Sequence, residues 1–425
     1  MVMTISIIGA GYVGTVAGIG FAEMGNKVIF VGRSKDKIKK INSLIPPIFE
    51  KNLKELMIKN KGKFYAIDDY EEAITSSDVT FICVGTPSKK DGGIDLSYIM
   101  KVSEEIGKVL LKKKDFHVIV VKSTVLPGTT ENIVGKIIGK ISHKEPFKDF
   151  GLASNPEFLR EGVALYDFLN PDRIVIGVND ERSKEIMLSL YEKFDSPKFI
   201  TDINTAEMIK YVSNAFLATK ISFANEIGNV CKKMGIDPYE VFKGVGLDHR
   251  INPTFFGAGL GFGGSCLPKD VRALIKKAEE LNEDVKILKS IMEVNENQPR
   301  RMIKILKKYL PDLNDKKICV LGLAFKPNTD DIRESRSIPI VGELIKENAI
   351  VIAYDPKAID NFSKIYPEIN YVDSAQYAID QADAVLIVTE WEEFKNLNYT
   401  NKIVIDGRKI EKAKKEAKIY EGLCW

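Results

Sequence analysis

The sequence is poor in the residue types that build metal sites and disulfide frameworks. Among 425 residues there are three histidines and five cysteines. The histidines stand far apart, at His117, His143 and His249. The cysteines are odd in number and form no CxxC pair: Cys83, Cys231, Cys266, Cys319 and Cys424. These spacings argue against a bound metal and against a disulfide framework, and they are typical of a protein of the reducing cytoplasm.

Excess charge and long apolar segments are lacking as well. The 62 Lys and Arg residues nearly balance 59 Asp and Glu, giving a net charge of +3, so neither nucleic acid nor an anionic membrane is indicated as a partner. Residues 1–22 carry no charge, but they have no basic n-region and are rich in glycine, which argues against a signal peptide. We expect a buried strand, a glycine turn and a close-packed helix there, and no membrane span elsewhere.

Short apolar runs alternate with polar helical segments through the first half of the chain. The clearest are "TISIIGAGYVG", "NKVIFVGR", "SDVTFICVGTP" and "FHVIVVKST", and "GLASNP", "RIVIGV" and "KFIT" follow them. Continuous apolar strands separated by helices predict a parallel sheet covered on both faces. The pattern returns from Asp315 in "KKICVLGLAF", "AIVIAYDP", "ADAVLIVTEW" and "KIVIDGR", which predicts a second α/β domain without the first domain's glycine motif.

Between these regions, apolar residues recur at helical spacing for about thirty residues from Thr205, without a proline. We interpret this segment as a long helix between domains and part of a subunit interface, although a plain core helix would explain most of its residues. A chain of this length needs more than one core. We expect a dinucleotide-binding domain (1–203), a central helical domain (204–300) and a second α/β domain (301–425).

The first glycine turn has the spacing of a dinucleotide-binding motif. Gly9, Gly11 and Gly14 form GxGxxG between an apolar run and a helical segment, a context that favours a bound pyrophosphate over a tight turn without a ligand. The acid that usually bonds the ribose hydroxyls at the tip of the second strand is replaced by Gly32, followed by Arg33. We therefore expect NADP to be used at least as well as NAD, unless Arg33 is only a surface charge that stacks on adenine.

The stretch "GLGFGGSCLPKD" places Cys266 at the exit of a glycine turn, beside Lys269 and Asp270. A thiol beside a cation, on a backbone open to close approach, predicts a nucleophile. An isolated cysteine is more often a small buried hydrophobe, which is our interpretation of Cys83, Cys231 and Cys319. Asp270 could also cap the helix that follows.

Nine ordered motifs carry a resemblance that covers nearly the whole chain. They are "GAGYVG", "FICVGTP" with "DLSYI", "KSTVLPGTT", "NPEFLREG" with "PDRIVIG", "EMIKYVSNAF", "GFGGSCLPKD" and "GLAFKPNTDDIRESRS". With them the chain resembles the nucleotide-sugar 6-dehydrogenases of the UDP-glucose/GDP-mannose dehydrogenase family. The resemblance implies two Rossmann-like parallel-sheet domains joined by a long central helix, dimerisation through that helical region, and NAD or NADP as hydride acceptor.

The resemblance also implies a reaction and its residues. A sugar C6 alcohol is oxidised twice, for UDP-glucose to UDP-glucuronate, and Cys266 forms a thiohemiacetal and then a thioester. Lys210 and Asn214 stabilise the oxyanion, Asp270 orients Lys210, Glu157 and Thr124 hold a water, and Glu161 lies beside the reacting centre. Lys210 as a solvated helix charge and Glu161 as a surface acid are the alternatives. Which group accepts the first proton stays open.

Binding roles follow from the same resemblance. The cofactor would contact Gly9, Gly11, Tyr12, Val13, Gly14, Arg33, Lys37, Gly85, Thr86, Thr124, Glu161, Lys269 and Arg333. The substrate would contact Phe158, Leu159, Arg160, Glu161, Lys210, Asn214, Arg250, Phe255, Gly263 and Lys326, with Arg250 reaching the neighbouring subunit's site. The alternatives are another nucleotide sugar (GDP-mannose or a UDP-N-acetyl-hexosamine), a two-electron β-hydroxyacid-type dehydrogenase, and a non-catalytic nucleotide-sugar sensor.

Overall fold

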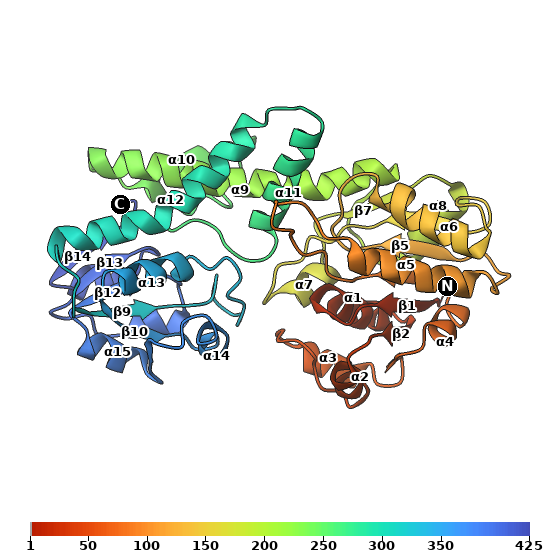
Figure 1. The fold of residues 1–425 in the computed structure, drawn as a ribbon, viewed down its shortest axis with the longest axis horizontal. Helices are drawn as coiled ribbons and strands as arrows, with labels where there is room; N and C mark the ends of the chain where they lie inside the picture. Colours follow the sequence, from red (N-terminus) through yellow and green to blue (C-terminus); the bar gives the residue numbers. More distant parts are fainter. Residues whose placement is uncertain (1) are drawn as a thin grey trace. The chain divides into compact units, whose positions relative to one another are not determined.

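The structure is a computed structural model that describes residues 2–425, and the chain divides into two compact units, 1–213 and 214–425 (Figure 1). The division falls inside one long helix, α9 (Ile203–Met234). Each unit contains its own sheet and core.

The first unit is built on an eight-stranded sheet in the order β3-β2-β1-β4-β5-β6-β7-β8. Its strands are β1 (Thr4–Ile8), β2 (Lys27–Val31), β3 (Phe64–Ile67), β4 (Val79–Ile82), β5 (Val118–Val121), β6 (Gly151–Ser154), β7 (Ile174–Val178) and β8 (Lys198–Thr201). All neighbours pair in parallel except β6 and β7, which departs from the all-parallel expectation. The only helix between them, α7 (Ala164–Leu169), rises about 9 Å, too little to return the chain to the far edge of the sheet.

Helices cover both faces of this sheet, as the apolar runs predict. Successive residues of one strand enter opposite cores: Ile7 packs under α1 (Tyr12–Glu23), and Ile8 packs under α5 (Ser97–Leu110). The other helices of the unit are α2 (Lys35–Asn42), α3 (Leu53–Lys59), α4 (Tyr70–Thr75), a π-helical turn (Thr130–Gly135), α6 (Lys136–Ser142) and α8 (Glu181–Leu190). The uncharged N-terminal stretch is therefore a buried strand and helix, as expected.

The second unit repeats this design in a six-stranded, fully parallel sheet, ordered β11-β10-β9-β12-β13-β14. Its strands are β9 (Lys317–Leu321), β10 (Ile350–Tyr354), β11 (Asn370–Tyr371), β12 (Ala384–Ile387), β13 (Ile403–Asp406) and β14 (Ile419–Gly422). Its helices are α13 (Ser337–Lys346), α14 (Ile359–Phe362), α15 (Ala375–Gln381), a 3₁₀ turn (Glu392–Asn396) and α16 (Glu411–Glu416). The strand order matches that of β1 to β6, which confirms the second Rossmann-like domain.

At the tip of β10, a buried carboxylate binds the loop that corresponds to the glycine turn of the first domain. Asp355, which is 2% exposed, follows β10 and accepts hydrogen bonds from the amides of Leu323 (2.7 Å) and Ala324 (3.0 Å) in the loop after β9. The same carboxylate accepts from the indole of Trp391 at 3.0 Å. A protein carboxylate thus takes the loop amides that would otherwise face a phosphate.

The long helix is confirmed as 32 residues, and it ends before Gly235, whose φ of +69° stops the helical path. Asp237 then caps α10 (Pro238–Gly246). Two further helices complete the central region, α11 (Leu267–Glu280) and α12 (Lys286–Tyr309). Within residues 2–425 we find no helix whose length and apolarity would let it cross a membrane.

Helix α9 buries polar side chains and exposes apolar ones. Glu207, Lys210 and Asn214 are at most 6% exposed, whereas Phe216 is 63% and Phe223 50% exposed. A plain core helix would show the opposite pattern. The buried polar groups belong to the candidate site, and the exposed apolar face is available to a partner.

The two later glycines of GxGxxG differ in the space around them. A Cβ on Gly14 would lie 2.0 Å from the Gly9 carbonyl oxygen and 3.1 Å from Cβ of Cys83. A Cβ on Gly11 would meet no atom within 4 Å, and its φ of −86° suits any residue. Gly14 is therefore needed by the fold, whereas the space at Gly11 is left open.

We expect Gly14→Ala to lower the free energy of unfolding by about 2 kcal/mol or more because the methyl group overlaps backbone atoms. Gly11→Ala should leave it within about 1 kcal/mol, since its methyl group enters free space. Guanidinium unfolding of both variants checks this. Equal destabilisation of the two variants would contradict the distinction.

A lysine is buried at the carboxyl end of β5. Lys122, 5% exposed, donates to the Asn155 side-chain oxygen (2.9 Å) and to its carbonyl (3.3 Å). Asn155 also accepts from the Tyr191 hydroxyl and donates to the Val175 carbonyl at 2.8 Å. Burial lowers the pKa of Lys122 to about 8. Lys122 thereby fastens the segment after β6 to the sheet.

This burial gives a pH dependence of stability with a defined sign. Below pH 8 the Lys122 ammonium is charged in both the folded and the unfolded state, so the free energy of unfolding is lowered by the full cost of burying a charge. Between pH 8 and the unfolded value of about 10.4, the unfolded chain binds more protons, so stability rises with pH. We expect the stability of the wild type relative to Lys122→Met to increase by about 3 kcal/mol over this window. Urea unfolding at pH 7.5, 9 and 10.5 measures it, with the exposed Lys136→Met as control; a flat difference would refute the assignment.

Candidate active site

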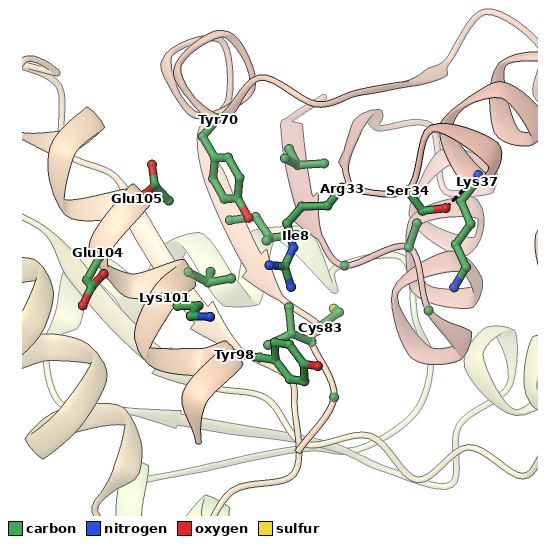
Figure 2. A pocket seen from close by; sticks show the side chains of 18 residues that line it. Ile8, Arg33, Ser34, Lys37, Tyr70, Cys83, Tyr98, Lys101, Glu104 and Glu105 are labelled. Carbon is green, nitrogen blue, oxygen red and sulfur yellow. Dashed lines mark hydrogen bonds between the residues drawn. The ribbon is translucent and has the colours of Figure 1, made fainter. Parts of the chain in front are cut away.

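A cavity of about 500 Å³ opens at the carboxyl ends of β1, β2 and β4 in the first unit (Figure 2). This is the edge at which parallel α/β sheets bind ligands. Of the predicted cofactor residues, it is lined by Gly9, Gly11, Arg33, Lys37 and Gly85. Tyr12, Val13 and Gly14 belong to α1, which begins directly after the glycine turn.

Open space at three glycines of this cavity indicates a ligand rather than an empty turn. Gly11, Gly32 and Gly85 all line it, and a Cβ on any of them would meet no protein atom within 4 Å. The first amides of α1 face the same space, where a helix N-terminus favours an anion. The residues present therefore fit a dinucleotide, whose pyrophosphate can approach the bare backbone.

The adenosine end of the cavity carries a cation where an acid is usual. Gly32 follows β2, and Figure 2 shows the Arg33 guanidinium between the rings of Tyr70 and Tyr98. The guanidinium carbon lies 5.6 Å from the centre of the Tyr98 ring. Ser34 is engaged as the N-cap of α2, where it accepts from the Lys37 amide at 3.4 Å.

Two predicted residues meet where β4 and β5 end. The Thr86 hydroxyl donates to the Thr124 carbonyl at 2.9 Å, and Thr86 is buried. The contact ties the loop after β4 to the loop after β5. It leaves the half-buried Thr124 side chain available for the predicted water.

The segment 155–162 is fixed by Tyr12 and by Glu50, which the sequence analysis did not select. Its Gly162 amide donates to the Tyr12 hydroxyl (2.8 Å) and to Glu50 (3.0 Å), and the Tyr12 hydroxyl itself donates to Glu50. Burial raises the pKa of Tyr12, so its hydroxyl stays protonated. Tyr12, predicted to bind cofactor, thus positions the half-buried Glu161 next to Gly162.

Glu157 and Lys210 form a buried ion pair. Their charged atoms are 3.2 Å apart, and the side chains are 8% and 5% exposed. The other Glu157 oxygen accepts from the Leu159 amide at 2.6 Å. The Lys210 ammonium also lies 5.4 Å from the centre of the Phe158 ring, whose face holds the Arg173 guanidinium at 3.8 Å. Burial of an ion pair is costly, so its retention is typical of a functional site.

Arg160 points away from this group. Its guanidinium pairs with Asp167 at 2.6 Å, and the side chain is 60% exposed. Leu159 is half-buried in the core beside α1. Phe158, Leu159 and Arg160, which were predicted to contact the substrate together, therefore lie in three different environments.

In the second unit, Cys266 lies at the N-cap of α11 and is exposed, with Ser265 Oγ 3.6 Å from its Sγ. The other four cysteines are buried, and none of the five is in a disulfide. Burial raises the pKa of the Cys83 thiol to about 12 and that of Cys424 to about 11. An accessible thiol at a helix N-terminus has the environment of a reactive cysteine, and the buried thiols do not.

Asp270 bridges Asn214 and Lys269. It accepts from the Asn214 amide at 2.6 Å and from the Lys269 ammonium at 2.5 Å, and it is 1% exposed. The alternative that Asp270 caps the following helix is wrong, because α11 begins at Leu267 and Asp270 lies within its first turn. Its carboxylate thus orients the amide of Asn214, which lies one turn beyond Lys210 on α9.

The remaining predicted residues lie in loops of the second unit. Lys326 and Arg333 belong to the loop after β9, and the Arg333 guanidinium pairs with Asp331 at 2.5 Å. Gly263 packs on this loop, since a Cβ there would lie 2.4 Å from the Glu334 carbonyl oxygen. Arg250 is 77% exposed and pairs with Asp248 at 2.6 Å. Phe255 has a φ of +67° and is 38% exposed.

Buried charges at loop ends were missed by the sequence analysis. Lys220 donates to the carbonyls of Ile251 (3.2 Å) and Asn252 (2.9 Å) and so holds the loop that carries Arg250 and Phe255. Glu207 accepts from the Gly128 and Thr130 amides at 2.7 and 2.9 Å, and burial raises its pKa to about 7. For Glu207 the available signal was its phase on the helix, since Glu207, Lys210 and Asn214 repeat at intervals of three and four; Lys220 does not share that phase.

Residues 2–425 contain no group of three or more His, Cys, Asp or Glu side chains arranged to hold a metal ion. The reactive groups described above, each in its own unit, are a thiol, amine and amide donors, and carboxylates. They suit covalent and acid–base chemistry at a carbonyl carbon.

Comparisons with known proteins agree with this arrangement. The chain matches three domain models of one family, the UDP-glucose/GDP-mannose dehydrogenases: the NAD binding domain over residues 3–195, the central domain over 204–297 and the UDP binding domain over 319–413. It is 44% identical to UDP-glucose 6-dehydrogenase AglM of Haloferax volcanii, over 99% of this chain and 100% of that protein.

Two solved structures are similar over nearly their full lengths. A UDP-glucose dehydrogenase from Pyrobaculum islandicum has a TM-score of 0.97 at 43% identity, covering 100% of this chain and 98% of that chain. A UDP-D-ManNAc dehydrogenase from Pyrococcus horikoshii has a TM-score of 0.88 at 29% identity, covering 99% of both chains. With the cavity, the exposed Cys266 and the buried Lys210 in place, these matches show that the chain belongs to the UDP-glucose/GDP-mannose dehydrogenase family.

Proposed function

We propose that this protein oxidises the C6 alcohol of UDP-glucose to the carboxylate of UDP-glucuronate in two steps. The observation that carries the proposal is Cys266, an exposed thiol at a helix N-terminus in a chain whose other cysteines are buried. We propose glucose rather than N-acetylmannosamine as the sugar because of the sequence identities. This chain is 43% identical to the UDP-glucose dehydrogenase of known structure and 29% identical to the UDP-D-ManNAc dehydrogenase. Bound NAD accepts one hydride in each step.

The thiol makes the second oxidation feasible. An aldehyde has no hydride that leaves readily until a nucleophile adds to its carbon. The Cys266 thiolate adds to give a thiohemiacetal, loss of hydride leaves a thioester, and water hydrolyses the thioester to the acid. A two-electron dehydrogenase would not need this cysteine, and a non-catalytic sensor would need neither the thiol nor the ion pair.

The buried polar side chains of α9 supply the electrostatics. Lys210 and Asn214 lie four residues apart on one helix face, so both can donate to the same oxyanion in a dry environment. Asp270 holds the Asn214 amide in place at 2.6 Å. Glu157, paired with Lys210 at 3.2 Å, is the candidate base for the hydrolytic water together with Thr124. Glu161 would lie beside the nicotinamide.

Arg33 leads us to propose that NADP is accepted as well as NAD. No acid at the tip of β2 bonds the ribose hydroxyls, since Gly32 stands there, and the guanidinium beside it can pair with a 2′-phosphate. For the second unit we propose binding of the UDP moiety near Lys326, with Arg333 toward the cofactor. The division into residues 1–203, 204–300 and 301–425 stays a prediction, as does a cytoplasmic location, which the scattered cysteines without a CxxC pair favour.

The exposed apolar face of α9 supports a homodimer. Val212, Phe216, Phe223 and Val230 recur at intervals of four and seven and are 49%, 63%, 50% and 51% exposed. A contiguous apolar stripe of this kind on one helix is typical of an interface between copies. The 77% exposed Arg250 would then reach the partner subunit's sugar site.

The stoichiometry of cofactor reduction tests the reaction. Purified protein with limiting UDP-glucose and excess NAD should form two equivalents of reduced cofactor per sugar, and NADP should support the same yield. Cys266→Ala should form no acid and lose about 10³-fold or more in overall turnover, because the aldehyde has no nucleophile. Absorbance at the reduced-nicotinamide band and mass spectrometry of the sugar give both quantities.

A matched control is Cys319→Ala, since Cys319 is a buried thiol of β9 in the second sheet whose removal should spare the stoichiometry. One equivalent of reduced cofactor in the wild type, with full activity of Cys266→Ala, would establish the two-electron alternative. Binding of UDP-glucose without any cofactor reduction would establish the sensor.

The dimer is tested separately. Phe216→Glu with Phe223→Glu should convert the wild-type oligomer to monomer in light scattering, because two charges would be buried in an apolar interface. Tyr166→Glu, a 65% exposed aromatic of the first unit, is the control. A wild type that is monomeric at all concentrations would refute the proposed interface.

A further inference from the structure

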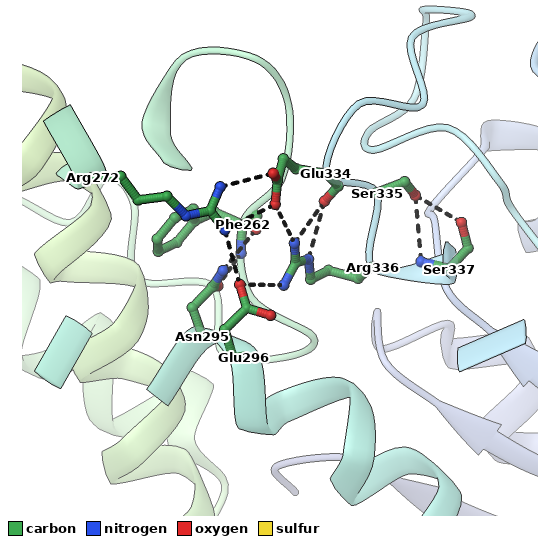
Figure 3. A network of polar contacts seen from close by, with 8 residues as sticks. All are labelled: Phe262, Arg272, Asn295, Glu296, Glu334, Ser335, Arg336 and Ser337. Carbon is green, nitrogen blue, oxygen red and sulfur yellow. Dashed lines mark hydrogen bonds and ion pairs between the residues drawn. The ribbon is translucent and has the colours of Figure 1, made fainter. Parts of the chain in front are cut away.

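A cluster of four charged side chains lies beside the start of α11 in the second unit (Figure 3). Arg272 of α11 pairs with Glu334 at 2.8 Å and with Glu296 of α12 at 3.4 Å. Arg336, 4% exposed, lies 3.4 Å from Glu334 and 3.6 Å from Glu296. The cluster thus joins α11, α12 and the loop after β9.

Glu334 is the residue through which this loop contacts both sides of Cys266. On the N-terminal side, the Gly264 amide donates to the Arg333 carbonyl at 2.9 Å, and Gly263 packs against the Glu334 carbonyl. On the C-terminal side, both oxygens of the Glu334 carboxylate accept from the Arg272 guanidinium, at 2.8 and 3.2 Å. Cys266 therefore lies between Gly263 and Gly264 on one side and Arg272 on the other, all of which contact Arg333 or Glu334.

The backbone at Glu334 is held in an unusual conformation. Its φ is +53°, in the left-handed region that a residue with a side chain rarely adopts. The Arg336 guanidinium clamps the Glu334 carbonyl with two hydrogen bonds, at 3.1 and 2.9 Å. Such a conformation persists when its surroundings determine it, and it is common where a chain must present a group in a set geometry.

The charges are arranged so that Glu334 stays ionised although it is half-buried. Burial opposes ionisation, but the bond from Arg272 and the charge of Arg336 lower the pKa of its carboxyl below the ordinary value. A bidentate pair of this kind fixes direction as well as distance. The Arg272 side chain is thereby locked, and with it the first turns of α11.

We propose that Glu334 is a positioning residue for the nucleophile, which holds Cys266 at the N-terminus of α11 through its bonds to Arg272 and its contacts with Gly263 and Gly264. Nucleophilic attack needs the sulfur placed to within a fraction of an ångström, and glycines alone cannot impose that. The inference rests on the proposed function for its catalytic meaning. The neighbouring Arg333 makes the same loop a point through which bound ligand would act on the thiol.

Alkylation of Cys266 by iodoacetamide tests the placement without any turnover. Glu334→Asp keeps the negative charge and only shortens the reach to Arg272. Aspartate also adopts the left-handed conformation more readily than glutamate. Since Cys266 is already exposed, looser packing does not improve its access, and leaving the helix N-terminus removes stabilisation of the thiolate. We expect alkylation at pH 7 to slow by about threefold, measured by mass spectrometry of the Cys266 peptide.

A matched control exists in the same unit. Glu347 pairs with Lys307 at 2.8 Å, and the two side chains are 34% and 37% exposed, against 36% and 34% for Glu334 and Arg272. Glu347→Asp should alkylate at the wild-type rate. Equal rates in the wild type, Glu334→Asp and Glu347→Asp would overturn the proposal.

The buried cysteines report whether a variant is folded. Labelling of Cys83 or Cys319 in Glu334→Asp would show that this variant is unfolded. Arg272→Lys, which keeps the positive charge but loses the bidentate contact of the guanidinium, is then used in its place. A wild-type rate of Cys266 alkylation in Arg272→Lys would overturn the proposal.

Turnover with UDP-glucose separates the inference from the proposed function. Glu334→Asp should lower kcat by about tenfold with KM for the sugar changed by no more than about twofold. A raised KM with unchanged kcat would overturn the positioning role. A wild type that does not oxidise UDP-glucose would refute the proposed function, and the alkylation rates would still decide the placement of Cys266.

Discussion

The structure depends on the burial of polar and charged side chains along one face of α9. Glu207, Lys210 and Asn214 are nearly inaccessible to water, and each needs a partner to be tolerated there. The partners are the amides of Gly128 and Thr130, the carboxylate of Glu157 and the carboxylate of Asp270. Gly128 and Glu157 lie in loops, and Thr130 and Asp270 lie in the first turns of helical segments, so these segments are held where α9 requires them. One constraint thereby orders both the core and the candidate site.

The same helix has a second, exposed apolar face. It buries polar side chains together with apolar ones such as Tyr211 and Ala218, whereas Phe216 and Phe223 lie outside. An isolated chain would gain nothing from this arrangement, because apolar surface in water is unfavourable. Burial by the second copy proposed above would resolve the conflict, and catalysis and assembly would then make opposite demands on the two faces of one helix.

The two Rossmann-like domains differ at equivalent strand tips. In the first, Gly32 leaves open space beside a bare glycine turn. In the second, Asp355 reaches back and bonds the amides of the turn itself. A single carboxylate thus decides whether a turn of this kind is free for a phosphate or is already satisfied. The repeated strand order, by itself, carries no information about the ligand.

The sequence alone determined the strand and helix pattern, the GxGxxG turn, the long helix and the choice of Cys266 as the candidate nucleophile, because all of these are local in the chain. Periodicity predicts an element, and a motif such as "GFGGSCLPKD" contains its own chemistry. Tertiary structure decided which charges are buried and with what partners, since Asn214 and Asp270 meet across 56 residues of chain. It also gave Lys122, Lys220 and Glu334 their places, turned Arg160 toward Asp167 and reversed β7. No local pattern marks a lysine that will be buried, because the cost of burying it is offset only by groups that folding brings to it.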